Sequence, residues 1–331
     1  MRRCLIATVL LLIASAVCAV ERDGRESVRI ATYNVQGVGA PESEQHEALV
    51  AVIERVDADV LLLQEIDAEF GDLEHIQAIA RRTGHEHVCL SEISGTLSGD
   101  LHTACLSRFP LVGCFSRSAA ALSSDPDAND ITRDILEAHV AVEPGEDVWG
   151  FFVVHLKGGR EERNVFRRQV EVRRIVQAIG SFARERPGSP IVLAGDLNED
   201  LGDGRFGSEH ETLPVGLPRT YRLGRDIAFP VVYGPFAAIR GRGLEPIDAF
   251  HEDDATDDAT RLRSWRRLDY LFVNEHLAVD GAEVYDSCDD NGKDDPAPGR
   301  PLPKPGRPLP CKVTGRAADH LPVFADVSRR Q

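Results

Sequence analysis

The feature that most constrains this sequence is a repeated pattern, in which an apolar run ends in a polar side chain able to do chemistry. The runs are SVRIATYN, ADVLLLQE, VWGFFVVH and PIVLAGD, which end at Asn34, Glu65, His155 and Asp196. Apolar runs of this length with polar flanks are typical of buried strands. Acidic and amide side chains disfavour strand interiors, so we expect these side chains at strand ends. Strand ends along one rim of a sheet hold their side chains rigidly, and functional residues are often found there. The pattern therefore predicts a functional site at one rim of the sheet.

Two later stretches place the polar side chain before the apolar run instead of after it. RLDYLFV carries Asp269, and ADHLPVF carries Asp319 and His320. In IVLAGDLNED, Asn198 follows two positions after Asp196. An Asp-x-Asn pair alone is typical of an ordinary turn, so the repetition of the pattern, and no single member, carries the functional interpretation.

Helical patterns lie between these predicted strands. Apolar residues at helical spacing predict helices over residues 44–55, from residue 73 to near Gly84, and over residues 161–184. Between residues 86 and 154, shorter β-type runs separated by turns predict antiparallel strands. A β-α-β unit, then a meander, then another helix and more strands predict an α/β fold with sheets packed face to face and helices outside.

The N-terminus has the composition of a secretory signal peptide. Arg2 and Arg3 precede an apolar stretch too short to span a bilayer, and small residues follow up to Ala19. We expect residues 1–19 to be removed, and no later segment is apolar enough for a membrane span. Residues 20–331 are then expected to form a single exported domain, either periplasmic or extracellular.

Two regions break the regular order and are predicted to be irregular insertions. Residues 200–262 are rich in glycine, proline and charge. Residues 286–316 contain DPAPGRPLPKPGRPLP, whose prolines favour extended polyproline II structure with no core to bury. We favour a spacer loop over a docking motif for this second insertion.

The charge balance limits the partners of the chain. Formal net charge is −16, and loss of Arg2 and Arg3 makes it −16 − 2 = −18. So acidic a chain is not expected to coat nucleic acid without sequence preference, because non-specific binding to nucleic acid depends on lysine and arginine neutralising phosphates. The negative net charge is still compatible with an enzyme that binds a phosphate group locally through a metal ion.

Of the seven cysteines, two leave with the signal peptide and five remain in a compartment that permits disulfides. Cys288 and Cys311 flank the proline-rich insertion, and we predict a disulfide between them. Cys89, Cys105 and Cys114 lie in strand-like runs and are expected to be buried small hydrophobes, with a disulfide between two of them left open.

Seven motifs occur in a familiar order, namely TYNVQG, LLLQEID, SRFPL, VVHLKGG, AGDLNED, RLDYLFV and ADHLPVF. Together they resemble the endonuclease/exonuclease/phosphatase superfamily, and the resemblance covers residues 28–327. It implies the pancreatic-deoxyribonuclease fold, a four-layer α/β sandwich of two packed mixed β-sheets flanked by helices. It also implies cleavage of phosphoester bonds with a divalent metal, usually magnesium, with manganese and calcium as alternatives.

The resemblance implies a metal centre at Glu65. A carboxylate is a hard oxygen ligand suited to Mg²⁺, which takes only one or two protein carboxylates and would polarise the phosphoryl oxygen. Asn34 would add an oxygen or orient that carboxylate, and Asp319 would lie near the metal.

The resemblance also implies the groups that act on the phosphate. Asp196 would orient the attacking water, with Asn198 fixing both Asp196 and the phosphate. His155 would donate a hydrogen bond to a phosphate oxygen. His320, with Asp269 holding its tautomer, would be the second imidazole that faces the phosphate, and its role as general base or charged clamp stays open.

Two arginines are candidates for phosphate binding. Arg108 in SRFPL resembles the family arginine near the phosphate. Arg133 in ITRDILEAHV would point into the same cleft, and a surface ion pair is the alternative for it.

Departures from the family limit the substrate. Abasic-site endonucleases carry an acidic residue where this chain has Gln36 and a lysine where it has Ile66 and Asp67, so a DNA-repair role is disfavoured. The Gln36 variant resembles the deoxyribonuclease branch. A calcium-loop reading of DSCDDNGKDD fails, because Pro298 stands where the bidentate glutamate should be when Gly292 takes the sixth position.

We therefore expect an exported metal-dependent phosphodiesterase of nuclease type, with nucleic acid as the favoured substrate. The enzyme alternatives are a phosphomonoesterase and a lipid phosphodiesterase similar to sphingomyelinases, although no aromatic lipid-binding hairpin is identifiable. A secreted binding module that has lost catalysis is disfavoured, because the full residue set is present. That set is Asn34, Glu65, His155, Asp196, Asn198, Asp269 and His320.

Overall fold

The computed structural model describes nine stretches of the chain. They are residues 27–67, 72–92, 101–117, 131–142, 148–200, 209–217, 231–232, 234–290 and 302–330. The predicted signal peptide, residues 1–19, lies outside the described residues. Within the described ranges, every helix is too short or too polar to cross a membrane.

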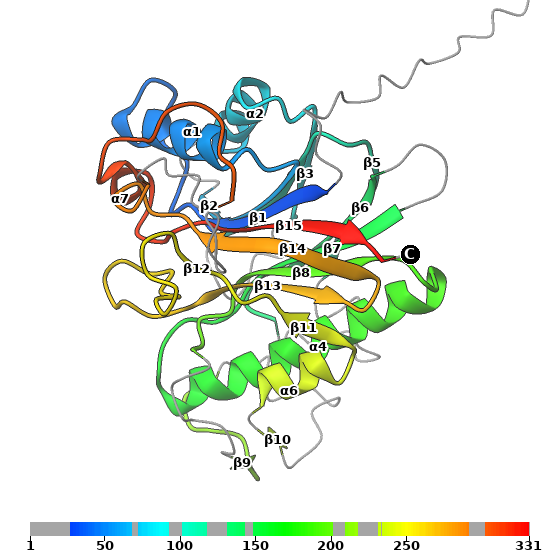
Figure 1. The fold of residues 1–331 in the computed structure, drawn as a ribbon. Helices are drawn as coiled ribbons and strands as arrows, with labels where there is room; N and C mark the ends of the chain where they lie inside the picture. Colours follow the sequence, from blue (N-terminus) through cyan, green and yellow to red (C-terminus); the bar gives the residue numbers. More distant parts are fainter. Residues whose placement is uncertain are drawn as a thin grey trace, which may run out of the picture.

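Two mixed β-sheets form the centre of the molecule (Figure 1). The seven-stranded sheet consists, in spatial order, of β12 (Phe250–His251), β14 (Leu277–Val284), β15 (Val323–Arg329), β1 (Val28–Asn34), β2 (Val60–Asp67), β4 (Leu101–Ser107) and β3 (His87–Leu90). The six-stranded sheet consists of β11 (Leu244–Pro246), β13 (Asp269–Asn274), β8 (Ile191–Asp196), β7 (Val148–His155), β6 (Ile135–Ala141) and β5 (Leu111–Arg117). A separate pair joins β9 (Glu209–His210) and β10 (Val231–Val232).

Helices cover the outer face of each sheet and complete four layers (Figure 1). The seven-stranded sheet is covered by α1 (Glu44–Val56), α2 (Asp72–Arg82) and α7 (Val313–Ala317). The six-stranded sheet is covered by α4 (Glu162–Glu185) and α6 (Pro235–Arg240). The predicted four-layer α/β sandwich of two mixed sheets flanked by helices is therefore confirmed.

The alternation of side chains along each strand produces these layers. In β7, Phe151 and Val153 belong to the core between the two sheets, whereas Phe152 and Val154 pack under α4. Successive side chains of a strand point to opposite faces, so a strand buried on both sides is apolar throughout. Each fully buried side chain of this size contributes about 1.5–3 kcal/mol of transfer free energy.

The proline-rich insertion differs from its prediction over residues 302–310. Leu302 and Leu309 pack against the core beneath α1, so the expected spacer with nothing to bury is wrong here. The Arg29 guanidinium donates to the Pro303 carbonyl at 2.7 Å, and that of Arg55 donates to the next three carbonyls. Proline lacks an N–H but keeps its carbonyl, and buried guanidiniums satisfy these acceptors.

Two disulfides are present in the described chain. Cys288–Cys311 closes the proline-rich insertion, as the sequence predicted. Cys89 in β3 pairs with Cys114 in β5, which is the alternative left open for the remaining cysteines. Because β3 and β5 are the edge strands of the two sheets, this bond joins the sheets along one side. Cys105 is free and buried.

Candidate active site

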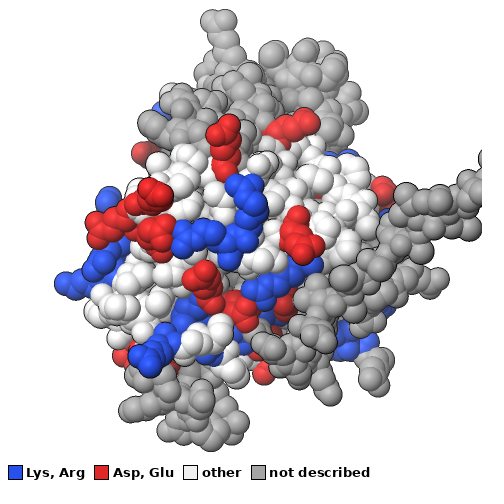
Figure 2. All heavy atoms as spheres, turned by 90° about the horizontal axis from the view of Figure 1, so that it is seen from above, with Lys and Arg blue, Asp and Glu red and all other residues white. Residues whose placement is uncertain are grey.

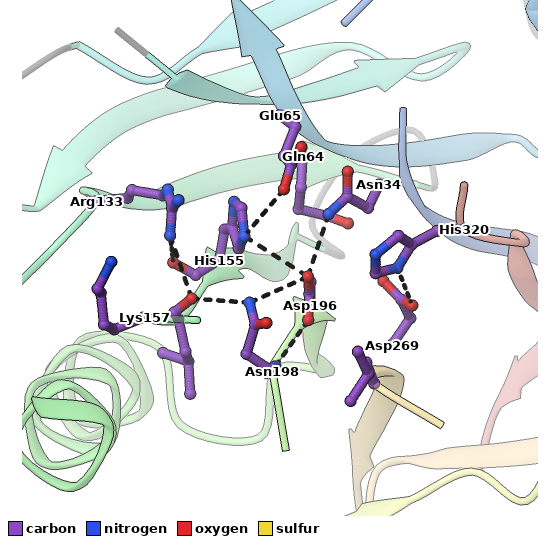
Figure 3. A network of polar contacts seen from close by, with 12 residues as sticks. Asn34, Gln64, Glu65, Arg133, His155, Lys157, Asp196, Asn198, Asp269 and His320 are labelled. Carbon is purple, nitrogen blue, oxygen red and sulfur yellow. Dashed lines mark hydrogen bonds and ion pairs between the residues drawn. The ribbon is translucent and has the colours of Figure 1, made fainter. Parts of the chain in front are cut away.

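The ends of several strands converge at one rim of the sandwich. In the seven-stranded sheet β1 and β2 are parallel, with Asn34 paired to Gln64, and in the six-stranded sheet β7 and β8 are parallel, with His155 paired to Asp196. Parallel neighbours end at the same edge of a sheet. Asp269, the first residue of β13, pairs with Asp196 in an antiparallel ladder, so Asp269 lies at the same rim as these strand ends. Figure 3 shows these side chains pointing toward one another.

A glycine allows β8 to deliver its terminal aspartate. Gly195 has a φ of +140°, and a Cβ there would lie 1.9 Å from the Val154 carbonyl oxygen. No side chain fits such an approach, so glycine is required immediately before Asp196. The sequence AGD thus brings the ends of β7 and β8 close together and places the Asp196 carboxylate at the rim.

The Asp196 carboxylate is held by two asparagines. Its Oδ1 accepts from the Asn198 backbone N–H at 2.7 Å, and its Oδ2 accepts from the side-chain Nδ2 of Asn34 at 3.1 Å and of Asn198 at 3.2 Å. Asn198 has a positive φ of 49° and also donates to the Leu156 carbonyl. The contact of Asn34 differs from expectation, because its amide orients Asp196 and not the Glu65 carboxylate.

A β-bulge directs Glu65 to the rim. The register between β2 and β4 shifts between Leu63 and Ile66, and both of these side chains face the helix layer although they are three residues apart. Glu65 itself has a φ of 60°, a left-handed conformation that is uncommon outside glycine. A bulge changes the direction of a side chain near the end of a strand, and here it turns Glu65 toward His155.

His155 lies between the two carboxylates. Its Nε2 is 3.5 Å from Glu65 Oε1 and 3.6 Å from Asp196 Oδ2. Burial, and then the charge of Arg133, hold the pKa of His155 well below its usual value, so the imidazole is neutral at pH 7. Its Nδ1 is buried and has no hydrogen-bond partner among the described residues.

The donor atoms of Glu65, His155 and Asp196 all lie within 4.8 Å of one another, close enough to surround one cation. Burial, together with the charges of Asp269 and Glu65, raises the pKa of Asp196 to about 7 against the opposing effect of His320. The protein alone therefore leaves this cluster with poorly compensated negative charge, which a divalent cation would relieve. The two carboxylates are hard oxygen ligands that fit such a cation.

On the other side of Asp196, His320 is paired with Asp269. His320 Nδ1 lies 2.7 Å from Asp269 Oδ2, which also accepts from the Thr260 hydroxyl at 2.6 Å. Burial lowers the pKa of His320, but the charges of Asp269 and Asp196 outweigh it and raise that pKa to about 9. The ring is therefore a buried imidazolium at neutral pH. The sequence carried no signal for Thr260, which lies in the predicted irregular insertion.

The two candidate arginines lie in different places. Arg133 is beside the site, where its Nη1 donates to the carbonyls of His155 at 3.4 Å and Leu156 at 3.2 Å (Figure 3). Arg108 follows β4, which is antiparallel to β2, so it lies at the opposite end of the sheet from Glu65. There it donates to Asp57 at 2.6 Å. The prediction that Arg108 binds phosphate is wrong.

Asp319 lies next to the site but outside its metal-binding cluster. Its Oδ2 pairs with Arg261 at 3.5 Å and with Arg263 at 3.9 Å, and its Oδ1 is 4.0 Å from His320 Nε2. Among the described residues, it joins none of the groups of three close donor atoms. The expected position of Asp319 near the metal is therefore replaced by one between His320 and two arginines.

Glu171 on α4 organises the cationic side of the site. Its carboxylate accepts from the backbone N–H groups of Thr132 and Lys157, both at 2.9 Å. This places Arg133 and Lys157 side by side next to His155 (Figure 3). Sequence reasoning missed Glu171, because a glutamate within a helix pattern looks like any exposed helix residue. Lys157 lay in the motif VVHLKGG without being assigned a role.

A four-layer α/β sandwich with such a rim is the architecture of enzymes that hydrolyse phosphoric esters. The Endonuclease/Exonuclease/phosphatase family model matches residues 31–320, a range that contains every rim residue named above. The chain therefore belongs to this family. A comparison with curated protein sequences finds no match.

Solved structures share the fold at low sequence identity. An endonuclease/exonuclease/phosphatase from Beutenbergia cavernae is 19% identical with a TM-score of 0.57, covering 92% of this chain and 72% of that one. The human Nocturnin catalytic domain with bound sulfate is 16% identical with a TM-score of 0.57, covering 92% and 96%. Truncated Caenorhabditis elegans TDP2 is 14% identical with a TM-score of 0.53, covering 91% and 97%. At these identities the likeness establishes the fold.

Proposed function

We propose that this protein is an exported, metal-dependent phosphodiesterase of nuclease type. The observation that carries the proposal is the position of Asp196, which is fixed by two asparagines between the neutral imidazole of His155 and the imidazolium of His320. A phosphodiester is anionic and repels hydroxide, so its hydrolysis requires an oriented water and cations or donors around the phosphate. The rim supplies both kinds of group.

Glu65 is the residue that would hold the divalent cation, with Asp196 and His155 beside it. When bound, the cation would polarise the phosphoryl oxygen and stabilise the leaving oxygen. Magnesium is the expected ion because the nearest donors include two carboxylates, and manganese or calcium are the alternatives to be compared with it.

Asp196 would orient the attacking water. Both of its oxygens already accept hydrogen bonds from Asn34 or Asn198, so the carboxylate has one fixed orientation. A carboxylate whose pKa is near neutrality also accepts a proton readily as the water attacks. Orientation of this kind lowers the barrier because the water need not be positioned anew in each reaction.

The two histidines would act on the phosphate from opposite sides of Asp196. Neutral His155, whose Nε2 faces the carboxylates, would donate its N–H to a non-bridging oxygen. His320 would act as a charged clamp rather than a general base, since its pKa of about 9 keeps it protonated at pH 7. Arg133 would add positive charge on the side of His155.

The charge of the surface bears on how a nucleic-acid substrate could bind. Figure 2 shows basic and acidic side chains interleaved on the face seen from above, so the described part of that face offers no broad basic patch. Binding of a nucleic acid would therefore depend on groups near the rim.

Two disulfides support the proposed export, because such bonds persist in oxidising compartments.

Hydrolysis assays on a small set of esters test the proposal. DNA, RNA, sphingomyelin, bis-p-nitrophenyl phosphate and p-nitrophenyl phosphate should be compared with magnesium and with EDTA. We expect metal-dependent cleavage of the nitrophenyl diester and of at least one nucleic acid. Release of phosphate only from the monoester would favour a phosphomonoesterase, and selective cleavage of sphingomyelin would favour a lipid phosphodiesterase. No turnover of any ester with any metal would refute an enzyme function.

A further inference from the structure

The loop formed by residues 261–266 lies directly beside the His320–Asp269 pair. Its ends meet in a bridge between Arg261 and Arg266, and a second bridge joins Arg261 to His320. The backbone N–H of Leu262 donates to the Asp319 carbonyl at 3.0 Å. In Figure 1 the chain around this loop is the yellow segment at the left, at the end of the sheets where β13 and β15 begin. The loop is thus fixed to the segment that carries the catalytic imidazole.

This loop exposes a tryptophan in a fixed orientation. Trp265 is 52% exposed, and its indole N–H donates to Asp257 Oδ2 at 2.8 Å. Its ring lies 5.6 Å from the ring of His251. A single exposed apolar residue is common on protein surfaces. Trp265 differs, because it also has a φ of 45°, and strained backbone of this kind at a non-glycine residue is concentrated at functional sites.

Three arginines share the loop with the exposed indole. Arg261, Arg263 and Arg266 belong to the loop, whereas the chain as a whole has a formal net charge of −16. Arg263 is 75% exposed, and its guanidinium is 3.9 Å from Asp319. Arg261 keeps a buried Nε that has no hydrogen-bond partner among the described residues. Each loop arginine lies within 4 Å of an aspartate, with Arg261 and Arg263 beside Asp319 and Arg266 beside Asp200. The loop therefore places one exposed π-face and the well-exposed guanidinium of Arg263 at the edge of the proposed phosphate site.

We propose that the 261–266 loop is a base-binding subsite for single-stranded nucleic acid, with Trp265 stacking on a nucleobase and Arg263 contacting a neighbouring phosphate. Every nucleobase has a π-face, so a fixed indole binds an unstacked base without sequence preference. A duplex keeps its bases stacked inside and cannot offer that face without unpairing. This inference rests on the proposed phosphodiesterase function for its location and adds to it the class of substrate.

Binding measurements without turnover test the subsite. A short single-stranded oligodeoxynucleotide and a base-free oligomer of the same sugar-phosphate length should be titrated against the full protein in EDTA. The chain has two tryptophans, and Trp149 is only 2% exposed, so quenching on binding reports mainly on Trp265. We expect the base-bearing oligomer to quench the fluorescence strongly and the base-free oligomer to quench it little.

Variants separate stacking from charge. Trp265→Ala should weaken binding of the base-bearing oligomer by roughly tenfold, with no change for the base-free oligomer. Trp265→Phe should retain most of the affinity. Arg263→Gln should weaken both oligomers equally and reduce the slope of log K against log salt concentration by about 1. Val215→Ala, which shortens a side chain that is 93% exposed outside the loop, is the matched control and should change neither.

The outcomes distinguish this inference from the proposed function. Equal losses for the two oligomers in Trp265→Ala, or no loss in either, would overturn the subsite even if the enzyme hydrolyses phosphodiesters. Conversely, base-dependent binding by a protein that cleaves no phosphodiester would leave the subsite standing and refute the enzyme function. Tighter, Trp265-dependent binding of a duplex than of the single strand would also overturn the inference.

Discussion

His320 and Asp269 join the two sheets of the sandwich through one hydrogen bond of 2.7 Å. Asp269 begins β13 of the six-stranded sheet, whereas His320 lies just before β15 of the seven-stranded sheet. Both side chains are buried, and both lie close to Asp196. Because each sheet supplies one partner, the charged state of the imidazole depends on correct packing of the two sheets.

This pair predicts the basic limb of the pH–rate profile. Against burial, the charges of Asp269 and Asp196 raise the pKa of His320 to about 9, so the imidazolium is present below that pH and is lost as the pH rises through it. We expect kcat for a phosphodiester to fall above about pH 9. In Asp269→Asn the charge that raises this pKa most is absent, so the fall should begin at lower pH. Profiles of kcat for both proteins, measured at saturating substrate and metal, check this.

A matched variant removes an acid that has no role in the pair. Asp254→Asn changes an exposed carboxylate and should keep the wild-type profile. If Asp269→Asn also keeps the wild-type basic limb, His320 does not act as a charged clamp.

The metal is tested through Glu65. Glu65→Gln keeps the shape of the side chain and removes its charge, so it should weaken magnesium binding and activity together. Calorimetric titration with Mg²⁺ and rates over a range of metal concentrations measure both effects. Wild-type rates for the variant at every metal concentration, including none, would show that Glu65 is not the ligand. Glu42→Gln, in the loop before α1, is a suitable control because the side chain is exposed.

Much of this site could be predicted from strand ends. Asn34, His155 and Asp196 each end an apolar run, and parallel pairing of β1 with β2 and of β7 with β8 brings such ends to one rim. Local sequence determines where a strand ends, so this part of the site follows from patterns alone. Face-to-face packing of the two sheets then brings the strand ends of one sheet next to those of the other.

Other parts depend on geometry that no local pattern carries. Arg108 follows an apolar run like the site residues do, but its strand is antiparallel to β2 and ends at the opposite rim. The bulge that directs Glu65 is visible only in the pairing of β2 with β4. Thr260 lies outside the helices and strands, in the segment between β12 and β13, and its hydroxyl bonds Asp269 nine residues later in the chain.

The Cys89–Cys114 disulfide predicts a test of sheet packing. It joins the edge strands β3 and β5 across a sequence separation of 25. In the chain-entropy model, closing a loop of that length contributes about 3 kcal/mol. We expect the double variant Cys89→Ala/Cys114→Ala to lose about that much free energy of unfolding in urea without reductant. Free thiols at both positions in the wild-type protein, detected by alkylation, would contradict the bond itself.

His85 predicts a loss of stability in mild acid. Its ring nitrogens contact Thr83 Oγ1 at 2.8 Å and the Ala58 carbonyl at 3.0 Å. Burial, and then the charge of Arg108, lower its pKa to about 4, against about 6.5 in an unfolded chain. Between these values the unfolded state binds more protons, so the free energy of unfolding falls as pH falls. Over the whole range between the two pKa values, the free energy of unfolding should fall by about 3 kcal/mol.

Urea unfolding in EDTA from pH 7 to pH 4 measures this effect. His85→Gln cannot take up the proton, so its free energy of unfolding should depend less on pH over that range. The difference between the two proteins isolates His85 from the other titrating groups. Parallel curves for wild type and His85→Gln would mean that His85 titrates normally in the folded protein.

The central prediction concerns the chemistry of Asp196 and His320. Groups that act mainly in the transition state lower kcat when removed, with little change in KM. Orientation of the water and stabilisation of the phosphoryl charge each contribute on the order of 10²–10⁴-fold. Asp196→Asn and His320→Ala should therefore each lower kcat by about 10²-fold or more, with folding intact by circular dichroism. Asp269→Asn should be milder, because it leaves the imidazole in place.

The double variant provides the sharpest measurement. Asp196 and His320 lie within one buried cluster and are proposed to serve one chemical event, so their losses should not multiply. We expect Asp196→Asn/His320→Ala to lose less kcat than the product of the two single losses. A full product would mean that the residues act in separate steps. Retention of half the wild-type kcat by Asp196→Asn, at saturating substrate with magnesium, would rule out the proposed mechanism.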